Sequence, residues 1–468
     1  MKAVRFKRAW LPVLALLLAL LLAGCGAPAP AAETGQSEAP PSVPEEEEPR
    51  EFSLGSLTVT PDTQSIDLPA SGASIEELMS ASDRLENIKE ISLGVTGANL
   101  AQLRAVEAAF PQADVSWQAE VLGRTVDCRA ESLDLRSAAD EDAEEIVSAL
   151  AVLPELKTLE LAPEGGVTAL SFDTLAAIAS AAPQAALHCR FELFGQTADW
   201  TTGKLKYYRT DVGNEGVDLF RAALPYLPSL ELLRFEECGI TDNDKMDALR
   251  SDYPDKRVVW SIPIGGYTFM TDTTLVNAAL ILTDENVDAL RYMHDVLYLD
   301  IGHNHYLTNI EFVRNFPKLQ VVIVTLSNIT DISPLEDCPD IEFLELVSTP
   351  IYSIDVVAGM DKLEYLNLGC MWNLSDISPV FGLTNLKIVR ICGTTFTHVS
   401  QEDVDRLKEA LPDTYVSDYG GDPTKSGHWR FNDDHSYTER YALLREQMRY
   451  DLVIWTEMLS DSPSGEED

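Results

Sequence analysis

The sequence predicts an α/β solenoid, in which short coils stack along one axis and share a continuous hydrophobic core. Three observations predict this fold class. An apolar pattern recurs at intervals of 22 or 23 residues over 296–399, a longer repeat precedes it, and 45% of the 468 residues are hydrophobic. A single coil cannot bury its apolar face alone, so a regular repeat of this length indicates coils that cover one another.

The short repeat has the form L-x-x-L-x-L-x-x-N/T/S-x-I and occurs five times. Its first positions lie 23, 22, 22 and 23 residues apart (319−296, 341−319, 363−341 and 386−363). The fourth and sixth positions alternate with other residues as on a strand that has one buried face. The repeat residues are Val296, Leu299, Ile301 and Asn304; Leu319, Val322, Val324, Ser327 and Ile329; Ile341, Leu344, Leu346, Thr349 and Ile351; Leu363, Leu366 and Leu368; and Leu386, Val389, Ile391, Thr394 and Phe396.

A longer repeat is marked by Pro111, Pro183 and Pro254, which lie 72 and 71 residues apart (183−111 and 254−183). Each proline ends a predicted helix and is followed by a predicted strand. A Gly-x-Thr sequence follows each strand and predicts a hairpin turn. Helical spacing over 138–153 and 216–224 adds helices to these units. The region is therefore predicted to be an irregular strand-helix solenoid, with a separate α/β domain as the alternative.

The short repeats resemble the leucine-rich repeats of bacterial proteins, most closely the internalin type. The sequences Ile-Thr-Asp-Ile-Ser-Pro-Leu at 329–335 and Leu-Ser-Asp-Ile-Ser-Pro-Val at 374–380 carry this likeness. The likeness is strong over 296–399 and loose over about 65–290. It implies a parallel concave sheet with helices and turns on the convex side, and a scaffold for binding rather than catalysis. Bacterial members of that family often bind host or neighbouring-cell proteins.

The resemblance also predicts which side chains line the concave face, because the fourth and sixth positions of such repeats point inward. Five large apolar side chains in a row would form a patch suited to partner binding. The alternative is that a cap element or another part of the chain covers the row. The predicted partner-binding residues are Tyr298, Val321, Phe343, Tyr365 and Ile388 at the third position and Asp300, Glu345, Asn367 and Arg390 at the fifth, where Ile323 also lies.

The first 25 residues resemble a bacterial lipoprotein signal. Basic residues precede a short apolar stretch, and a Leu-Ala-Gly-Cys sequence ends at Cys25. The family's chemistry attaches a diacylglycerol to that thiol, so we expect Cys25 to anchor the protein outside the cytoplasm, on the bacterial cell membrane or cell surface. The apolar stretch is too short for a comfortable membrane span. A plain secretory signal with a chance cysteine is the alternative.

These signals divide the chain into five regions. They are a signal peptide at 1–24, a disordered Pro/Glu-rich tether at 25–60, long repeats at 61–290, short repeats at 291–416, and a C-terminal cap with a disordered tail at 417–468. An amphipathic helix over 436–459 is predicted to close the open end of the solenoid. A helix that docks a partner is the alternative.

Charge narrows the class of partner. The chain has 76 acidic and 35 basic residues and a net charge of −41, which disfavours binding to nucleic acid. The resemblance to leucine-rich repeat proteins, and the lack of a P-loop, G-x-S-x-G, H-E-x-x-H or EF-hand sequence, lead us to expect a monomeric, non-catalytic protein that binds a protein or a glycan and holds no cofactor or metal. An envelope enzyme or enzyme inhibitor built on the same scaffold is the alternative.

Two further features of the sequence, a histidine pair and the remaining cysteines, are expected to have structural rather than functional roles. His303 and His305 have a spacing that can hold a metal, but Asn304 between them occupies the repeat position whose amide bonds to a neighbouring coil. Six cysteines follow Cys25, and buried free thiols are the expected state, with a Cys370–Cys392 bridge as the alternative.

Overall fold

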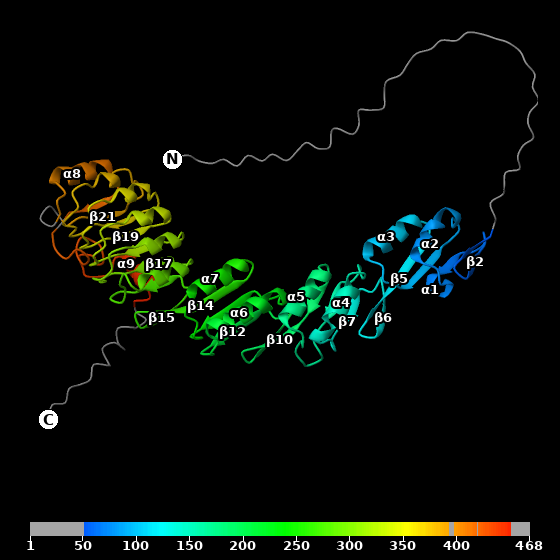
Figure 1. Ribbon diagram of the computed structural model, residues 1–468. Helices are drawn as coiled ribbons and strands as arrows, with labels where there is room; N and C mark the ends of the chain where they lie inside the picture. Colours follow the sequence, from blue (N-terminus) through cyan, green and yellow to red (C-terminus); the bar gives the residue numbers. More distant parts are fainter. Residues whose placement is uncertain (1–50, 393–396, 419, 451–468) are drawn as a thin grey trace, which may run out of the picture.

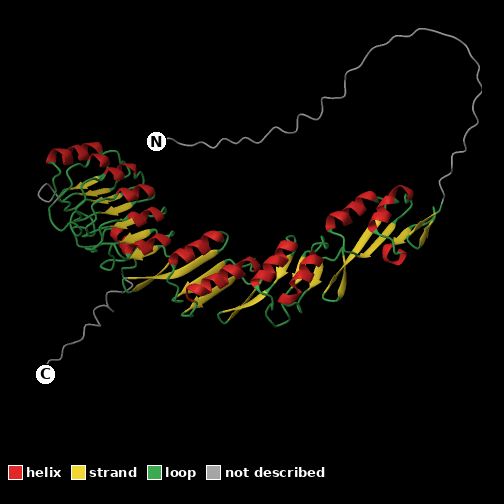
Figure 2. Cartoon of the chain, in the orientation of Figure 1, coloured by secondary structure: helices red, strands yellow, loops and turns green. Residues whose placement is uncertain are grey.

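The computed structural model describes residues 51–392, 397–418 and 420–450, so the signal peptide, Cys25 and the predicted tether up to residue 50 lie outside the described residues. Coils follow one another along an elongated, curved body (Figure 1). Strands run along one side of the long repeats and helices along the other (Figure 2). No described helix combines the length and the hydropathy needed to cross a membrane.

One buried cluster runs through most of the body, from Ala119 in the long repeats to Leu411 after the last short repeat. A second cluster, from Leu54 to Cys128, forms the core of the N-terminal unit. Val152 packs against both. From about residue 119 onward the long and short repeats therefore share one core, as a continuous solenoid requires, and only the N-terminal unit has a core of its own.

The short repeats form a parallel sheet whose described strands follow chain order. Its register aligns the predicted third positions, with Tyr298 opposite Val321 and Phe343 opposite Tyr365. Leu344 and Leu366, at the fourth position, are 0% exposed, which confirms the predicted orientation of the strands. The strands are β16 (Leu275–Asn277), β17 (Tyr298–Asp300), β18 (Val321–Ile323), β19 (Phe343–Glu345), β20 (Tyr365–Asn367), β21 (Ile388–Arg390) and β22 (Tyr415–Ser417).

Each strand of this sheet is linked to the next through a short helix. The last of these links is an α-helix, and Pro412 follows it after one residue. The helices are η4 (Val287–Tyr292), η5 (Glu311–Asn315), η6 (Ser333–Asp337), η7 (Asp355–Gly359), η8 (Ser378–Val380) and α8 (Gln401–Ala410).

The long repeats pair parallel strands in the same way and add antiparallel hairpins. Helices α4 and α6 lie where helical spacing predicted them. The strands are β3 (Ser65–Asp67), β4 (Glu90–Val95), β5 (Asp114–Val121), β6 (Arg124–Asp127), β7 (Ser132–Asp134), β8 (Thr158–Glu160), β9 (Ala186–His188), β10 (Arg190–Leu193), β11 (Gln196–Asp199), β12 (Lys204–Tyr208), β13 (Leu232–Glu236), β14 (Arg257–Ile264) and β15 (Tyr267–Met270). The helices are α1 (Leu68–Ser71), α2 (Ile75–Ser80), η1 (Ser82–Arg84), α3 (Leu100–Ala109), η2 (Asp140–Asp142), α4 (Ala143–Leu150), α5 (Phe172–Ala181), α6 (Gly213–Ala223), η3 (Leu224–Tyr226) and α7 (Asn243–Asp252).

The predicted hairpin turns are present between β5 and β6, β10 and β11, and β14 and β15. Both central residues of each turn have positive φ, for example 50° at Leu122 and 66° at Gly123. A two-residue turn of this kind matches the twist of the strands that it joins, which is why glycine occupies its second position.

A left-handed residue follows the strands of both kinds of repeat. After β17 it is His303, with φ of 61°, and after β18 it is Leu326, with φ of 54°. Arg209 after β12 and Glu237 after β13 have φ of 49° and 52°. A positive φ is energetically costly for residues other than glycine, and it is kept here because it directs peptide N–H groups to the next coil. The backbone N–H of His303, for example, donates to Thr325 O at 2.6 Å.

Asn304 has the structural role that its position predicted. Its Oδ1 accepts the N–H of Leu282 at 2.8 Å, and its Nδ2 donates to Ala278 O and Ile301 O, both at 2.9 Å. Two of these bonds cross to the preceding coil, so a side chain that is only 2% exposed ties two coils together.

Several predicted boundaries were wrong. β1 (Phe52–Leu54) and β2 (Leu57–Val59) form a hairpin with Leu54 and Val59 in the core, so the folded body begins inside the predicted tether. β16 pairs with β17, so the short-repeat sheet begins before residue 291.

The described cysteines are all free, including Cys370 and Cys392.

Candidate functional site: the concave face and the segment that covers it

Residues 420–450, called the covering segment below, lie across the concave face of the short-repeat sheet. The segment contains α9 (Glu439–Gln447), which Figure 1 shows beside β17 and β19. Leu444 and Met448 of this part of the chain join a cluster with strand residues of the concave face. The described part of the predicted cap therefore lies on the concave face, while α8 and β22 form the last coil. The buried members of the cluster are Val321, Ile323, Phe343, Trp429, Leu444 and Met448.

Trp429 is the central contact of the covering segment. It is 4% exposed, and its ring centre lies 5.0 Å from that of Phe343. Its indole N–H donates to the carboxylate of Glu345, which is 0% exposed. The same carboxylate accepts hydrogen bonds from Thr325 Oγ1 at 2.7 Å and from Arg430 at 2.9 Å. Burial alone would lower the pKa of Arg430, but the charge of Glu345, together with Tyr441, Tyr450 and the hydrogen bond to Glu345, outweighs burial and raises that pKa. A carboxylate on an apolar sheet is thus paired and hydrogen-bonded by the covering segment.

The end of the covering segment reaches the neighbouring acid. Tyr450 donates its hydroxyl to Asp300 Oδ2 at 2.5 Å, and the N–H of Gly302 donates to Oδ1 at 2.9 Å. Burial raises the pKa of Asp300, and these two bonds only partly oppose the shift. Asp300 therefore carries an energetic penalty for its charge.

The start of the segment is held by the other end of the sheet. Asn367 donates to Pro423 O at 3.0 Å, and Arg390 donates to Ser426 Oγ at 3.2 Å. Arg390 also donates to Ser417 at the end of β22. The fifth-position polar residues thus bind the backbone and side chains of the protein's own C-terminal part.

The expectation of an exposed concave row was wrong. Val321, Ile323 and Phe343 are 1%, 3% and 3% exposed, and Glu345, Asn367, Arg390 and Asp300 are buried. Tyr298, Tyr365 and Ile388 are half-buried beside the segment. The physical reason is that a contiguous apolar row is favourable to cover, and the alternative left open by the sequence is the one that the structure has. Whether these residues contact a partner stays a prediction.

The row still reaches solvent in two cavities at the sides of the covering segment. A cavity of about 590 Å³ is lined by Asp300, Ile323, Arg430 and Tyr450, among others. A second, of about 340 Å³, is lined by residues of β20, β21, β22 and the covering segment. These are the places where a partner could meet residues of the predicted row.

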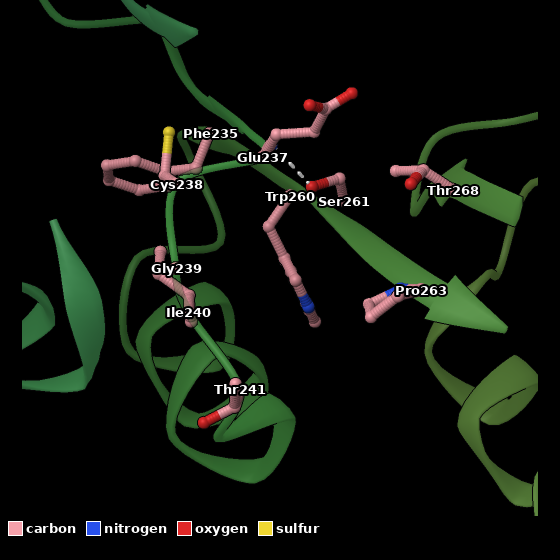
Figure 3. A pocket seen from close by; sticks show the side chains of 10 residues that line it. All are labelled: Phe235, Glu237, Cys238, Gly239, Ile240, Thr241, Trp260, Ser261, Pro263 and Thr268. Atoms are coloured by element: carbon pink, nitrogen blue, oxygen red, sulfur yellow. Dashed lines mark hydrogen bonds between the residues drawn. The ribbon is translucent and has the colours of Figure 1, made fainter. Parts of the chain in front are cut away.

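A small hollow and an ionic network lie away from the concave row. A hollow of about 160 Å³ in the long repeats is lined by Phe235, Cys238 and Trp260, and in it Glu237 N donates to Ser261 Oγ at 2.8 Å (Figure 3). Its small volume and satisfied polar contact give it no evident ligand.

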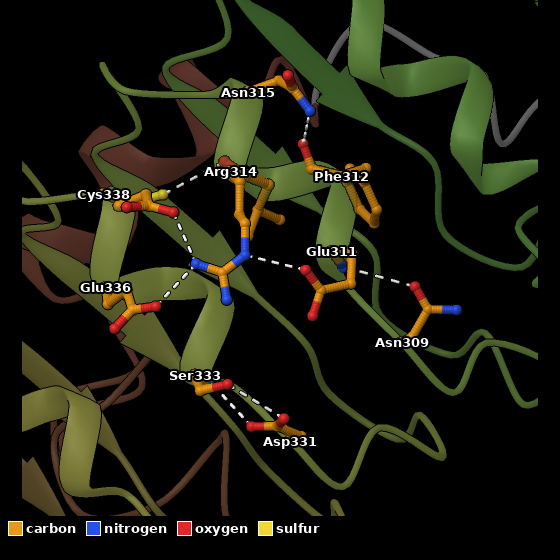
Figure 4. A network of polar contacts seen from close by, with 11 residues as sticks. Asn309, Glu311, Phe312, Arg314, Asn315, Asp331, Ser333, Glu336 and Cys338 are labelled. Atoms are coloured by element: carbon orange, nitrogen blue, oxygen red, sulfur yellow. Dashed lines mark hydrogen bonds and ion pairs between the residues drawn. The ribbon is translucent and has the colours of Figure 1, made fainter. Parts of the chain in front are cut away.

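An ionic network links two coils. Arg314 of η5 bonds to Glu311 at 2.9 Å and, across to η6, to Glu336 at 2.8 Å and Asp337 at 2.6 Å (Figure 4). Hydrogen bonds to these carboxylates, above all that of Asp337, raise the pKa of Arg314. The network is a surface link between coils and has the modest stabilising value of exposed ion pairs.

His303 and His305 are not joined by further ligands: within the described ranges no group of three or more His, Cys, Asp or Glu side chains is placed to hold a metal ion.

Sequence reasoning missed the residues that complete the site, namely Trp429, Arg430, Arg440, Tyr415 and Tyr450. They were assigned to a cap or left without a role. A usable signal was present: acids on a predicted apolar face need donors if that face is covered, and the Trp429-Arg430 pair supplies both an indole N–H and a cation.

The comparisons with known proteins were made on sequence and on structure. No protein-family model and no curated protein matches the chain. Similar solved structures include an internalin of Listeria monocytogenes, at 14% identity and a TM-score of 0.24, covering 74% of this chain and 71% of that one. A leucine-rich repeat protein of Leptospira interrogans has 14% identity and a TM-score of 0.28, covering 71% of this chain and 91% of that one.

Internalin C2 of Listeria monocytogenes has 20% identity and a TM-score of 0.22, covering 48% of this chain and 85% of that one. These three solved structures are bacterial leucine-rich repeat proteins. At such low identities and TM-scores they add no argument of their own, and the repeat architecture rests on the stacked coils, the parallel register and the shared core of this chain.

Proposed function

We propose that this protein is an extracytoplasmic, lipid-anchored binding module without catalytic activity, which takes a protein or glycan partner at the rims of its covered concave face. The observation that carries the proposal is the covering segment itself. The concave sheet holds a polypeptide through an aromatic anchor, Trp429, and a buried ion pair, Arg430 with Glu345. A surface with aromatic anchors and satisfied charges has the chemistry of a recognition surface.

The state of the buried acids supports binding over catalysis. Glu345 accepts three hydrogen bonds and Asp300 accepts two, all from groups of the protein. A general acid or base must be within reach of a substrate proton, and these carboxylates are engaged in holding the covering segment. The partner would therefore meet the half-buried Tyr365 and Ile388 and the exposed residues beside them.

The anchor belongs to the proposal through Cys25, which lies outside the described residues. A lipid on that thiol and the Pro- and Glu-rich stretch after it would hold the folded body away from the membrane surface. The first strand of the described residues, β1, begins 27 residues after Cys25 (52−25).

The test is a binding screen of residues 26–468 against an array of cell-surface proteins and oligosaccharides. We expect saturable binding that Tyr415→Ala weakens, because Tyr415 is 48% exposed and lines the smaller cavity. Tyr352→Ala is the matched control, since Tyr352 is 66% exposed and lines neither of the two cavities beside the covering segment. The absence of any saturable ligand, or turnover of a ligand on the array, would overturn the proposal.

A further inference from the structure

The cavity of about 340 Å³ beside the covering segment combines a cation, aromatic rings and hydrogen-bonding groups. It lies where β20, β21 and β22 meet the start of α9. Its volume is at the lower end of the range for sites that hold a small molecule or one unit of a larger ligand. The lining residues that matter are Tyr365, Tyr415, His428, Asn432, Glu439 and Arg440.

Arg440 is a half-buried cation that forms no ion pair with a described residue. Its Nη1 donates to the neutral amide of Gln447 at 2.8 Å, and its guanidinium lies 5.0 Å and 5.5 Å from the ring centres of Phe343 and Tyr365. Arg430, in the same segment, has Glu345 as its partner. Burial lowers the pKa of Arg440, because Tyr365 and the carboxylates of Glu342 and Glu364 do not fully offset the loss of water.

The remaining donors of Arg440 stay accessible. A guanidinium has five N–H groups, and only one hydrogen bond to a described residue is formed. The nitrogens of Arg440 are not among the side-chain atoms of the described residues that are buried without a hydrogen bond. Arg440 is half-buried and lines the cavity, so a ligand that enters the cavity meets this side chain.

The other walls suit a hydroxylated ring. Tyr415 is 48% exposed, and His428 meets it edge-on with ring centres 5.2 Å apart. The Tyr365 hydroxyl makes no hydrogen bond with a described residue, and Glu439 is an exposed acceptor. Aromatic faces attract the C–H face of a sugar ring, and a carboxylate or hydroxyl oxygen accepts its O–H groups.

We propose that this cavity binds a carboxylated sugar residue of a glycan, with the sugar carboxylate on Arg440, the ring against Tyr415, and hydroxyls on Tyr365 and Glu439. The proposal rests on the proposed binding function and names its ligand class. Arg440 supplies a planar pair of donors that matches a carboxylate.

The charge of the whole protein limits the ligand further. A net charge of −41 repels extended polyanions at low ionic strength. A terminal sugar with a single carboxylate is repelled only weakly by the net charge of the protein, and its carboxylate is attracted by the nearby guanidinium of Arg440. The site therefore fits an oligosaccharide that ends in one acidic sugar better than a chain in which every unit is charged.

The experiment compares two matched oligosaccharides, one ending in a hexuronic acid and one ending in the corresponding neutral hexose, by titration calorimetry on residues 26–468. A polyuronate and free hexuronate are added as further ligands. We expect the acidic oligosaccharide to bind at least about tenfold more tightly than the neutral one, because hydrogen bonds between a guanidinium and a carboxylate are stronger than those to a neutral hydroxyl. Free hexuronate should compete with it.

Arg440→Gln should remove most of this preference, and Arg440→Lys should restore part of it. Arg406→Gln is the control, because Arg406 is an exposed arginine of α8 that also lies over a ring, that of Phe381. If Arg440→Gln also lowers the melting temperature, Tyr415→Ala tests the same site at an exposed side chain.

Three results of the titrations overturn the inference: equal affinity for the acidic and neutral sugars, an acid preference that Arg440→Gln leaves unchanged, and tightest binding of the polyuronate. A protein ligand, or a neutral glycan, that depends on Tyr415 but not on Arg440 would overturn the inference and leave the proposed function standing. Failure of the wild-type protein to bind any arrayed ligand would overturn both.

Discussion

Trp429 donates its indole N–H to the carboxylate of Glu345, a residue 84 positions earlier in the chain that is fully buried in the middle strand of the concave sheet. This contact fixes the C-terminal segment to the face that the repeat pattern presents for binding. It also explains why an acid can be fully buried beside the apolar third-position row, since the segment brings both a neutral donor and the Arg430 cation to it.

Trp429→Ala should lower the free energy of unfolding by about 3–5 kcal/mol, because it leaves a large cavity against Phe343 and removes one donor from Glu345. Urea denaturation measures the change. Tyr352→Ala, at a residue 66% exposed, should change it by no more than about 0.5 kcal/mol. Equal midpoints for wild type and Trp429→Ala would show that Trp429 is not part of the core.

The ion pair between Glu345 and Arg430 should show coupling in a double-mutant cycle. Arg430→Gln should cost about 3 kcal/mol, because Glu345 has no access to water and loses its counter-charge. Adding Glu345→Gln should then cost much less than it does alone, with a coupling free energy of about 1–3 kcal/mol. Additive effects within about 0.5 kcal/mol would contradict a direct, buried pair.

Asp300 should make stability depend on pH. Its pKa in the folded protein is raised by burial, above about 3.9 for an exposed aspartate. The folded protein therefore retains a proton that the unfolded chain releases, and the stability from this group is present below about pH 4 and lost as pH rises through the folded pKa. Asp300→Asn has no such titration.

The free energy of unfolding of Asp300→Asn, measured by urea denaturation, should accordingly gain on that of wild type between about pH 4 and pH 8. A difference that stays constant over this range, or that changes in favour of wild type, would contradict a raised pKa at Asp300.

Cys25→Ala tests the anchor. If a diacylglycerol is attached to the Cys25 thiol, the variant should leave the membrane fraction or remain uncleaved, because no other acceptor lies at that site. Detergent partitioning and the mass of the N-terminal peptide report the two effects. A variant that is processed and partitions like wild type would rule out lipidation of Cys25.

The repeat frame could be predicted because it is a local property of the sequence. Leu344 and Leu366 are buried as their positions require, and Asn304 bonds backbone of an adjacent coil. The hairpins after Pro111, Pro183 and Pro254 follow from the glycine at each turn. Each of these depends on contacts within one coil or between neighbouring coils, and the residue spacing encodes them.

The occupant of the concave face could not be predicted in the same way. Trp429 and Glu345 meet over 84 residues, and no periodicity connects them. The helical spacing of the C-terminal segment shows that it has an apolar face. That face could be buried equally well against the last coil or against the concave sheet, because the hydrophobic effect does not distinguish between two apolar surfaces. The predicted end of the tether at residue 60 was wrong because β1 and β2 are three-residue strands, too short to show a clear alternation of apolar and polar residues.

Hydroxyl-radical footprinting tests most directly whether the covering segment lies on the concave face in solution. Oxidation depends on access of solvent to a side chain, so matched residues can be compared within one sample. Trp429 and Phe343, which are 4% and 3% exposed, should be protected, while Trp372 and Tyr352, which are 53% and 66% exposed, should be modified rapidly. Modification of Trp429 and Phe343 at rates like those of Trp372 and Tyr352 would contradict the account, because the concave face would then be open.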